Sequence, residues 1–516
     1  MSDPMDLTEP FDPAEVPDGG MLHGTVGEDE VVVVRVDAEL FAIGASCTHY
    51  GGPLNEGVFD GRCVRCPWHH AAFDVRTGRA ERGPAVTPVS TYAVTVTDGM
   101  ATLAAESVDA ESDDNGGAAQ TAALPDLGRI VVVGGGGAGH AFVYRLIERG
   151  HEGPVVMIST EQGVPVDRPN VSKDYLAGSA EPEWMPIHGA DVYDSDQITL
   201  LRDRQVTKLD LDGGTVELND GTNEEFDVLV LATGAEPRPL PVDDGTVRYL
   251  RTQANADQIA GALPDGGGRA VVIGASFIGL EAASSLRKRG AEVDVIAPED
   301  TVLSGIVGPQ LGTRIESEHR EAGVRLHLGR SVEKIAGGVV TIDDGTALQC
   351  DVVVAGIGVI PRTDLAEDTI LQVDDGIMVD ADYHALGADS IGLPNVLAIG
   401  DVARRPLGTG TARIEHWSMA LRDGQIAADT LLGTEGAEYG APFFWTAQHN
   451  MSLRYMGHAT DPDRFEVDGD LKDDDATVKV WQNDRIAAVI TVGRDPAGLQ
   501  AELALEADDQ EALANM

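Results

Sequence analysis

Cysteine and lysine are scarce in this chain. Its 516 residues include four cysteines and six lysines, and three of the cysteines lie in one short segment, which excludes a disulfide framework. Long apolar runs are also missing, since none approaches the roughly 20 residues that a membrane helix needs. The acidic N-terminus lacks the basic and apolar regions of a signal peptide. These absences predict a protein with no membrane span and a cytoplasmic location.

Basic residues are much rarer than acidic ones. Lysine and arginine total 37 against 86 aspartate and glutamate residues, for a net charge of −49. Such a surface repels nucleic acid and anionic membranes. The acids are spread along the whole chain, so their mutual repulsion opposes folding at low salt, and concentrated counterions would screen it. We interpret the charge as halophilic, typical of a salt-accumulating cytoplasm such as that of haloarchaea, rather than as an acidic tail.

Changes of pattern divide the chain into several domains. Residues 10–105 contain short strands separated by turns, which predicts a small all-β domain. A stretch rich in Ala, Gly, Asp and Ser follows and is typical of a flexible linker. Residues 129–150 and 269–300 each hold a buried strand, a glycine turn and a helix, so two α/β doubly wound dinucleotide folds are expected. The last part, after Gly433, indicates a separate α+β C-terminal domain.

The scarce cysteines are spent together with histidines. Cys47-x-His49 and Cys66-x-x-His69 are two short loops with one thiol and one imidazole each. Thiolate and imidazole suit zinc or iron–sulfur. Zinc fingers usually pair like ligands in each half, whereas a Rieske centre replaces two of four cysteines with histidines on one iron. We therefore predict a [2Fe–2S] cluster with Cys47 and Cys66 on one iron and His49 and His69 on the other.

The residues around these ligands carry a resemblance. "CTHYGGPL" and "CPWHHAAFD" resemble the two loops of the Rieske ferredoxin family, over about residues 15–105. His70 departs from that pattern, because a glycine is common there, and Cys63 is interpreted as a small packing residue. High-potential members carry hydroxyl side chains where this chain has Ala71 and Phe73, so the resemblance implies a potential nearer about −150 mV than +300 mV. The histidine edge of such a centre is expected to be exposed and to serve as the exit for electrons.

The first glycine turn follows a buried strand and opens a helix. Gly134 permits the tight turn, Gly136 lets the backbone approach a pyrophosphate, and Gly139 lets helix and strand pack closely. No acid ends the next strand to bind ribose hydroxyls, and Glu161 is the nearest substitute. The context supports a dinucleotide site.

The second glycine turn contains Gly274, Ser276 and Gly279. The strand that follows it ends beside Glu299, which could take the ribose hydroxyls of a nucleotide. No arginine or lysine appears after Gly290 until position 314, so nothing local in the sequence would neutralise a 2′-phosphate. The turn therefore predicts NADH in preference to NADPH.

Other segments resemble FAD-dependent pyridine-nucleotide reductases over nearly all of residues 129–500. These segments are "DRPNVSKDYL", "LVLATGAEPR", "NVLAIGDVAR", "IEHWSMALRDGQIAADTLLG" and "PFFWT". A Rieske domain ahead of such a reductase is similar to the apoptosis-inducing-factor-like proteins, with oxygenase-type ferredoxin reductases as close relatives. The implied order is an FAD domain interrupted by an NAD domain and followed by a C-terminal domain.

The resemblance also implies roles for single residues. Arg168 and Lys173 would contact FAD, with Lys173 near the isoalloxazine and paired to Glu281. Glu415 would lie near the nicotinamide, and Trp445 would pack beside the flavin. The catalytic set is therefore Lys173, Glu281, Glu415 and Trp445. Asp401 would bind the ribityl chain, and the same segments supply the remaining expected cofactor contacts: Thr233, Gly234 and Gly400.

The expected fold class is multidomain, with a small all-β Rieske domain followed by α/β doubly wound FAD and NAD domains and an α+β C-terminal domain. The expected boundaries are 1–106 for the Rieske domain, 107–127 for the acidic linker, 128–245 and 366–435 for the two parts of the FAD domain, 246–365 for the NAD domain and 436–516 for the C-terminal domain.

One absence indicates where the electrons go. Disulfide reductases of this superfamily carry a reactive cysteine beside the flavin, and no cysteine lies between Cys66 and Cys350. We therefore predict that electrons pass from NADH through FAD to the fused cluster and on to an unidentified acceptor. Two alternatives stay open: the electron-supply component of a ring-hydroxylating oxygenase, and a redox sensor with little turnover. A homodimer also stays open.

Overall fold

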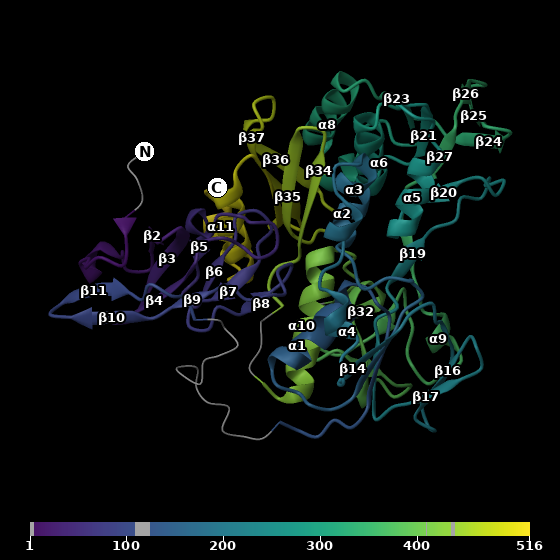
Figure 1. Ribbon diagram of the computed structural model, residues 1–516. Coiled ribbons are helices and arrows are strands. Elements are labelled where there is room, and N and C mark those ends of the chain that lie inside the picture. The colour runs from purple at the N-terminus through teal and green to yellow at the C-terminus, as the bar shows by residue number, and fades with distance from the viewer. Residues whose placement is uncertain (1–4, 109–123, 409, 435–438) are drawn as a thin grey trace.

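The computed structural model describes residues 5–108, 124–408, 410–434 and 439–516. Most of the expected linker therefore lies outside the described residues. Within them, no helix combines the length and the apolar character needed to cross a bilayer. Figure 1 shows the N-terminal strands packed at one side of a larger α/β body, with the C-terminal helix α11 beside them.

The N-terminal region is built from two sheets, which confirms the expected all-β Rieske domain. One sheet has the order β1-β2-β3-β4-β9 and the other the order β5-β6-β7-β8. The strands are β1 (Met5–Asp6), β2 (Met21–Val26), β3 (Asp29–Val36), β4 (Glu39–Gly44), β5 (Val58–Phe59), β6 (Cys63–Arg65), β7 (Ala72–Asp74), β8 (Ala80–Arg82) and β9 (Thr91–Tyr92), with the hairpin β10 (Val94–Thr97) and β11 (Met100–Leu103) beyond them.

The valines of β3 show why this region folds as a sheet. Side chains alternate between the two faces of a strand. Val32 and Val34 enter the core that also contains Cys47 and Cys66, while their neighbours in the strand enter a second core on the opposite face. The run of four valines is thus buried on both sides, and one of its two faces supports the cysteine loops.

The first doubly wound sheet has the order β14-β13-β12-β18-β31-β30. All its pairs are parallel except the outermost, between β31 and β30. Its strands are β12 (Ile130–Val133), β13 (Val155–Ile158), β14 (Ile198–Leu201), β18 (Val228–Leu231), β30 (His384–Leu386) and β31 (Gly392–Ala398). Helices α1 (Gly137–Glu148) and α10 (Trp417–Leu432) pack on each other, and the second brings a late segment of the chain back to the first glycine turn.

The second doubly wound sheet is fully parallel, with the order β20-β27-β21-β22-β23. Its elements are β20 (Arg248–Tyr249), β21 (Arg269–Ile273), β22 (Glu292–Ala297), β23 (Arg325–Leu328) and β27 (Val352–Ala355), with helices α5 (Gln253–Gly261), α6 (Phe277–Lys288), α7 (Ser304–Val307) and α8 (Pro309–Glu321). The apolar strands are continuous runs because both faces of a parallel sheet are covered.

The C-terminal region is an antiparallel sheet with helices, as expected for an α+β domain. Its order is β34-β35-β38-β37-β36. The elements are β34 (Phe443–Gln448), β35 (Met451–Gly457), β36 (Arg464–Asp470), β37 (Asp475–Gln482), β38 (Arg485–Val492), α11 (Asp495–Glu506) and α12 (Gln510–Ala514).

Short elements connect these units. They are α2 (Arg168–Ser172), α3 (Asp174–Ala177), α4 (Ala190–Tyr193), α9 (Asp364–Glu367), β15 (Val206–Asp210), β16 (Thr215–Leu218), β17 (Asn223–Glu225), β19 (Ala235–Pro237), β24 (Val332–Ala336), β25 (Val339–Ile342), β26 (Ala347–Gln349), β28 (Val359–Pro361), β29 (Ile377–Met378), β32 (Ala403–Leu407) and β33 (Gly410–Ala412). The antiparallel pair β19 and β28 lies where the chain enters and leaves the second doubly wound unit.

Candidate redox site

The two cysteine loops have the same backbone design. The N–H of Gly51 donates to the carbonyl of Cys47 at 2.8 Å, and the N–H of His70 donates to the carbonyl of Cys66 at 3.1 Å. Each loop closes in the left-handed region, with φ of 72° at Gly51 and 60° at His70. Left-handed backbone favours glycine because it has no Cβ. This explains the glycine expected at position 70 and raises the question of why a histidine is there.

The four predicted ligands come together as two pairs. The thiols of Cys47 and Cys66 contact each other in the core, and the Nδ1 atoms of His49 and His69 are 3.2 Å apart. A Cβ added at Gly52 would lie 2.7 Å from the sulfur of Cys66, so this turn has room only for glycine. A two-iron centre needs two ligands for each iron, whereas zinc needs four around one point. The paired arrangement fits the [2Fe–2S] cluster.

The side chain of His70 makes buried contacts that explain why a histidine occupies this left-handed position. Its side chain is fully buried, its Nδ1 lies 3.0 Å from Oε2 of Glu502 in α11, and its ring stacks on Phe443 at 4.0 Å. Glu502 is also fully buried and accepts from Arg65 of β6 at 3.3 Å and from Arg422 of α10 at 3.1 Å. Three parts of the chain therefore meet at one carboxylate directly behind the second cluster loop.

The basic groups around Glu502 outweigh its burial. Burial alone would raise the pKa of this carboxyl, but the surrounding positive charge holds it below its ordinary value. Glu506, one turn further along α11, accepts from Arg65 at 2.9 Å and from Arg82 of β8 at 2.6 Å. The Rieske region is thus attached to the C-terminal domain by ion pairs that are largely removed from water.

The histidine edge does not have the free exposure that the sequence predicted. The ring of His69 lies 4.3 Å from the ring of Trp445, and the ring of His49 lies 5.9 Å from it, measured between centroids. Both histidines are half-buried. This edge is less exposed than expected because docking of the Rieske region places the C-terminal domain against it, and its role as the exit stays a prediction.

A cavity of about 980 Å³ lies on the other side of Trp445. The first glycine turn lines it through Gly134 and Gly136, and the second lines it through Ser276. The backbone of Gly134 is left-handed at φ 130°, and a Cβ there would lie 2.0 Å from the carbonyl oxygen of Ala232. Two strand-turn-helix units, far apart in the sequence, therefore face one cavity.

The predicted residues distribute over this cavity as follows. Those that line it are Gly134, Gly136, Arg168, Lys173, Thr233, Gly234, Ser276, Glu281, Asp401, Glu415 and Trp445. Those that do not are Gly139, Gly274, Gly279, Glu299 and Gly400. Gly139 and Gly279 instead make the close helix packing, since a Cβ on either would lie 2.2 Å from the carbonyl oxygen of the first glycine of its turn.

Lys173 and Glu281 form the expected ion pair in the wall of the cavity. The Nζ of Lys173 lies 2.8 Å from Oε2 of Glu281. Ser172 donates to the same oxygen at 2.5 Å, and Thr446 of β34 donates to Oε1 at 2.6 Å. The carboxylate is buried and is held from two sides, by the end of α2 and by β34. The sequence did not predict the two hydroxyl donors, Ser172 and Thr446, because no local pattern indicates their role.

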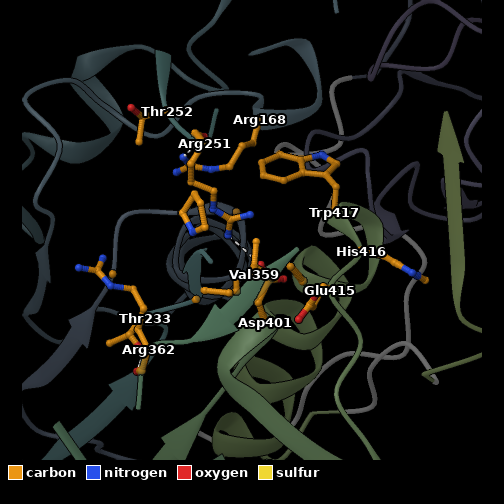
Figure 2. A pocket seen from close by; sticks show the side chains of 18 of the residues that line it. Arg168, Thr233, Arg251, Thr252, Val359, Arg362, Asp401, Glu415, His416 and Trp417 are labelled. Atoms are coloured by element: carbon orange, nitrogen blue, oxygen red, sulfur yellow. Dashed lines mark hydrogen bonds and ion pairs between the residues drawn. The ribbon is translucent and has the colours of Figure 1, made fainter. Parts of the chain in front are cut away.

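The opposite wall contains a second set of charges. Figure 2 shows Arg251 reaching towards Asp401, and the two are 2.7 Å apart. Glu415 pairs with Arg413, and burial raises the pKa of this glutamate. Burial lowers the pKa of His416 to about 4, so this imidazole is neutral near pH 7.

Among the described residues, two buried polar atoms in the cavity wall have no hydrogen-bond partner. These are Nδ1 of His416 and Nε1 of Trp417, both residues that line the cavity. Buried polar groups are almost always hydrogen-bonded, so these atoms suit a ligand with polar groups. Together with the glycine turns, they fit the FAD that the sequence predicted.

The end of β22 differs from what local sequence indicated. Glu299 is exposed there, as expected for a residue that meets a ribose. The fold also brings Arg330 alongside, since its N–H donates to the carbonyl of Ala297 at 3.0 Å. The guanidinium of Arg330 lies 3.4 Å from Asp344 and 3.8 Å from Asp343. A basic side chain is therefore near the nucleotide position, but two acids neutralise it.

A further contact joins the Rieske loop to the cavity segment. The hydroxyl of Tyr50 donates to Oδ2 of Asp167, which directly precedes Arg168. Burial raises the pKa of Asp167 to about 7, while the nearby Lys173 opposes that rise. The ring of Tyr50 stacks on His49 with centroids 3.9 Å apart and planes at 17°.

A paired-ligand iron–sulfur site beside a cavity lined by two dinucleotide turns defines a flavin- and nicotinamide-dependent oxidoreductase with its own Rieske centre. Comparison with known families gives the same class. The pyridine nucleotide-disulphide oxidoreductase family matches residues 128–424, and the Rieske [2Fe-2S] domain matches residues 9–93. The chain belongs to the pyridine nucleotide-disulphide oxidoreductase family, and it is an NADH-dependent FAD oxidoreductase fused to a Rieske domain.

Similar proteins include reductases and a longer relative. The putidaredoxin reductase CamA of Pseudomonas putida is 37% identical over 382 residues, which are 71% of this chain and 88% of that one. Apoptosis-inducing factor 3 of Mus musculus is 27% identical over 498 residues, 93% of this chain and 81% of that one. The ferredoxin–NAD(+) reductase component of the anthranilate 1,2-dioxygenase system of Burkholderia cepacia is 35% identical over 71% of this chain and 91% of its own length.

A solved structure gives the same result. The covalent putidaredoxin reductase–putidaredoxin complex aligns with a TM-score of 0.69 at 34% identity, covering 74% of this chain and 93% of that one. The comparisons thus confirm the predicted fold class, family and cofactors.

Proposed function

We propose that the chain holds a complete electron relay, in which Trp445 connects the flavin cavity to the cluster. The observation that carries this proposal is the position of one ring: Trp445 lines the cavity and lies 4.3 Å from the ring of His69. When bound, FAD accepts a hydride from NADH and releases its electrons one at a time, which suits a [2Fe–2S] acceptor.

The chain's own residues have defined tasks in this relay. Lys173, fixed by Glu281, places a positive charge at the cavity wall, where it stabilises negative charge that develops on a bound flavin. Arg168 and the first glycine turn receive the pyrophosphate at the start of α1. Asp401 accepts from the ribityl hydroxyls, and Arg251 holds that carboxylate in place.

The nucleotide side has its own residues. Glu415 lies near the nicotinamide, and the second glycine turn, Gly274, Ser276 and Gly279, receives the pyrophosphate of NADH. The Oγ of Ser276 accepts from the N–H of Gly279 at 3.1 Å and so caps the start of α6. Glu299 takes the ribose hydroxyls, and the neutralised Arg330 leaves no free positive charge for a 2′-phosphate.

The last acceptor is external to the chain. Supply of electrons to an oxygenase is the second candidate, because the printed name of one relative places it in a dioxygenase system. Redox sensing is the third, because a relative that covers 93% of this chain is named an apoptosis-inducing factor. Rapid turnover with cytochrome c supports either kind of reductase, whereas a stable complex after one turnover supports a sensor.

The remaining sequence-based statements also belong to this proposal. They are the domain boundaries given above, a cytoplasmic setting, a halophilic source and a homodimeric assembly. The support for the halophilic source is the net charge of −49. The support for the bounds of the NAD domain is the second doubly wound sheet, which runs from Arg248 to Ala355.

Substitution of Trp445 tests the relay. In the anaerobic holoprotein, NADH should bleach the flavin of Trp445→Ala as fast as that of the wild type. Reduction of the cluster, followed by its Rieske-type EPR signal, should then be clearly slower than in the wild type. Trp445→Phe should recover part of the rate.

Trp481 provides the matched control. It lies on β37 of the same sheet, stacked with Arg464 and away from the cavity lining. Trp481→Ala should leave both rates unchanged. Equal cluster reduction in Trp445→Ala and Trp481→Ala would refute the relay through Trp445.

A further inference from the structure

Docking of the Rieske region raises a question that the relay does not answer. The cysteine side of the centre is buried in a core, and His69 faces Trp445. Electrons that arrive along this side need another way to an external acceptor. The other face of His49 is the remaining side of the cluster loops.

Tyr50 lies against that face. Its ring is nearly parallel to the imidazole of His49, at 3.9 Å and 17°, and it is 43% exposed. Among the described residues, the ring of His49 contacts the rings of Tyr50, His69 and Trp445. Of these three, only Tyr50 is neither a predicted ligand nor part of the relay. One face of Tyr50 thus contacts a cluster ligand, while another part of the ring meets solvent.

The reductase holds Tyr50 in this position. Its hydroxyl donates to Asp167, whose own N–H donates to the carbonyl of Met185 at 2.8 Å. Trp184, the residue before Met185, is 67% exposed. Two aromatic side chains from different domains therefore reach the surface on segments joined by hydrogen bonds. Exposed apolar side chains that gather beside a functional centre indicate an interaction site.

The charge beside these rings indicates the kind of partner. Glu181 and Glu183 flank Trp184, both are exposed, and neither forms an ion pair within the described part of the chain. Acidic residues around exposed aromatics favour a partner with a positive face, since complementary charge steers association.

The ion pairs behind the cluster argue that this route is used without undocking. The fully buried Glu502 pairs with Arg65 of the Rieske region and contacts the buried His70 of the same region. Breaking a buried pair leaves an uncompensated charge, and this is strongly unfavourable. Repeated separation of the Rieske region during turnover would expose or break these contacts.

Resting on the proposed relay, we propose that electrons leave the docked protein through Tyr50 to a one-electron acceptor protein with a positively charged face, which binds over Tyr50 and Trp184. Each NADH supplies two electrons, so two acceptor molecules are each reduced by one electron, and NAD⁺ and one proton are released. Tyr50 is the contact through which the electrons pass and is itself neither oxidised nor deprotonated.

Cross-linking locates the face directly. The holoprotein is mixed with cytochrome c, a basic haem protein, and treated with a carbodiimide that joins carboxylates to lysines. Mass spectrometry of the digested product should place the cross-links at Glu181 and Glu183. Cross-links spread over the surface, or concentrated at another site, would overturn the proposal. This readout does not depend on turnover.

Kinetics of three variants give a second readout. Tyr50→Leu and Glu183→Lys should slow reduction of cytochrome c by about tenfold, within the range over which variants of one interface change association. In Glu183→Lys, which lies outside the relay, reduction of the cluster by NADH alone should stay at the wild-type rate. The control is Asp389→Lys, an exposed acid beside the exposed Ile391 near the β30 edge, which should change neither rate.

The two proposals fail in different ways. A wild-type protein in which NADH reduces the flavin but not the cluster would overturn the relay. Normal cluster reduction, with cytochrome c rates that Tyr50→Leu and Glu183→Lys leave unchanged, would overturn the exit face alone.

Discussion

The two sides of the flavin cavity are built differently. Towards the cluster, the domains are joined through His70, Arg422 and Glu502, all fully buried. Towards the nucleotide, the cavity lining includes Ile278 and Ile306, which are 45% and 44% exposed. The difference matches what each side has to do. The cluster stays in place and needs a fixed distance, whereas NADH must enter and NAD⁺ must leave at every turnover.

The comparison also shows how scarce positive charge is used. Only 37 basic residues serve the chain, yet several of them are buried between domains. Arg65, Arg145 and Arg422 each pair with acids that are themselves largely buried. A buried charge without a partner costs several kcal/mol. These arginines therefore neutralise acids that are buried, whereas many surface acids are neutralised only by water and dissolved ions.

The largest expected effect comes from breaking the cluster side at Glu502. Glu502→Gln leaves Arg65 and Arg422 without their shared carboxylate, and removal of one partner from a buried pair costs about 3–5 kcal/mol. We expect a clear fall in melting temperature and slower reduction of the cluster. Glu511→Gln, an exposed acid on α12, is the control and should melt like the wild type. An unchanged melt for Glu502→Gln would show that these ion pairs do not hold the domains.

A smaller effect is expected at His70. His70→Gly relieves the left-handed strain but leaves Glu502 without one partner, a loss of about 1–3 kcal/mol for a hydrogen bond to a buried charged group. Two irons and two sulfides per chain should remain, with the same Rieske-type EPR signal, because the sequence assigns the iron to His69 and not to His70. His70→Asn tolerates the same backbone and separates strain from bonding. Loss of the cluster in both variants would mean that His70, and not His69, binds iron.

These two residues show what the sequence could and could not predict. The four ligands and the two glycine turns were predictable because each depends on spacing within one loop or turn. The contact between His70 and Glu502 spans 432 positions, and that between Tyr50 and Asp167 spans 117. No local pattern encodes such a pairing. The sequence marked His70 as a departure from the family, but only the docked domains give the departure a physical reason.

The same limit explains why two surfaces along the relay differ from what their local sequence indicates. An exposed histidine edge is a fair expectation for an isolated Rieske domain, and docking covers it with Trp445. No basic residue is close to Glu299 in the sequence. In the fold, however, β23 and the residues after it bring Arg330 beside the end of β22. In both cases, packing of distant segments changed a surface that local sequence described correctly.

The pKa values of two buried carboxyl groups, Asp167 and Glu502, are shifted in opposite directions. The pKa of Asp167 is raised to about 7, above its value in the unfolded chain. An acid of this kind favours the folded state at low pH, and this contribution is lost as pH rises from about 4 towards 7. The pKa of Glu502 is lowered, so its contribution has the opposite sign: it is present above the unfolded pKa and lost on acidification.

Melting curves across pH 5 to 8 should separate the two groups. Relative to the wild type, Asp167→Asn should gain stability as pH rises, because the wild type alone pays for ionising that buried carboxyl. Asp191→Asn, an exposed acid, is the control and should follow the wild-type curve. A constant difference between Asp167→Asn and the wild type over this range would show that Asp167 does not titrate there.

Salt should produce the smallest change on the cluster side and a visible one on the nucleotide side. At about 0.1 M salt the screening length is roughly 10 Å, and at about 1 M it is roughly 3 Å. Buried pairs are screened much less than surface charges, so the flavin-to-cluster rate should hardly respond once the protein is folded. Surface acids repel one another and repel the anionic NADH, so the melting temperature and the affinity for NADH should both rise with KCl. Titration of NADH and thermal melts across the same KCl series measure the two effects together.

A melting temperature that stays flat or falls towards molar salt would remove the case for a halophilic source. A cluster reduction rate that rises in parallel with NADH affinity would instead show that the domain contact is an ordinary surface contact, and the contrast between the two sides of the cavity would no longer hold.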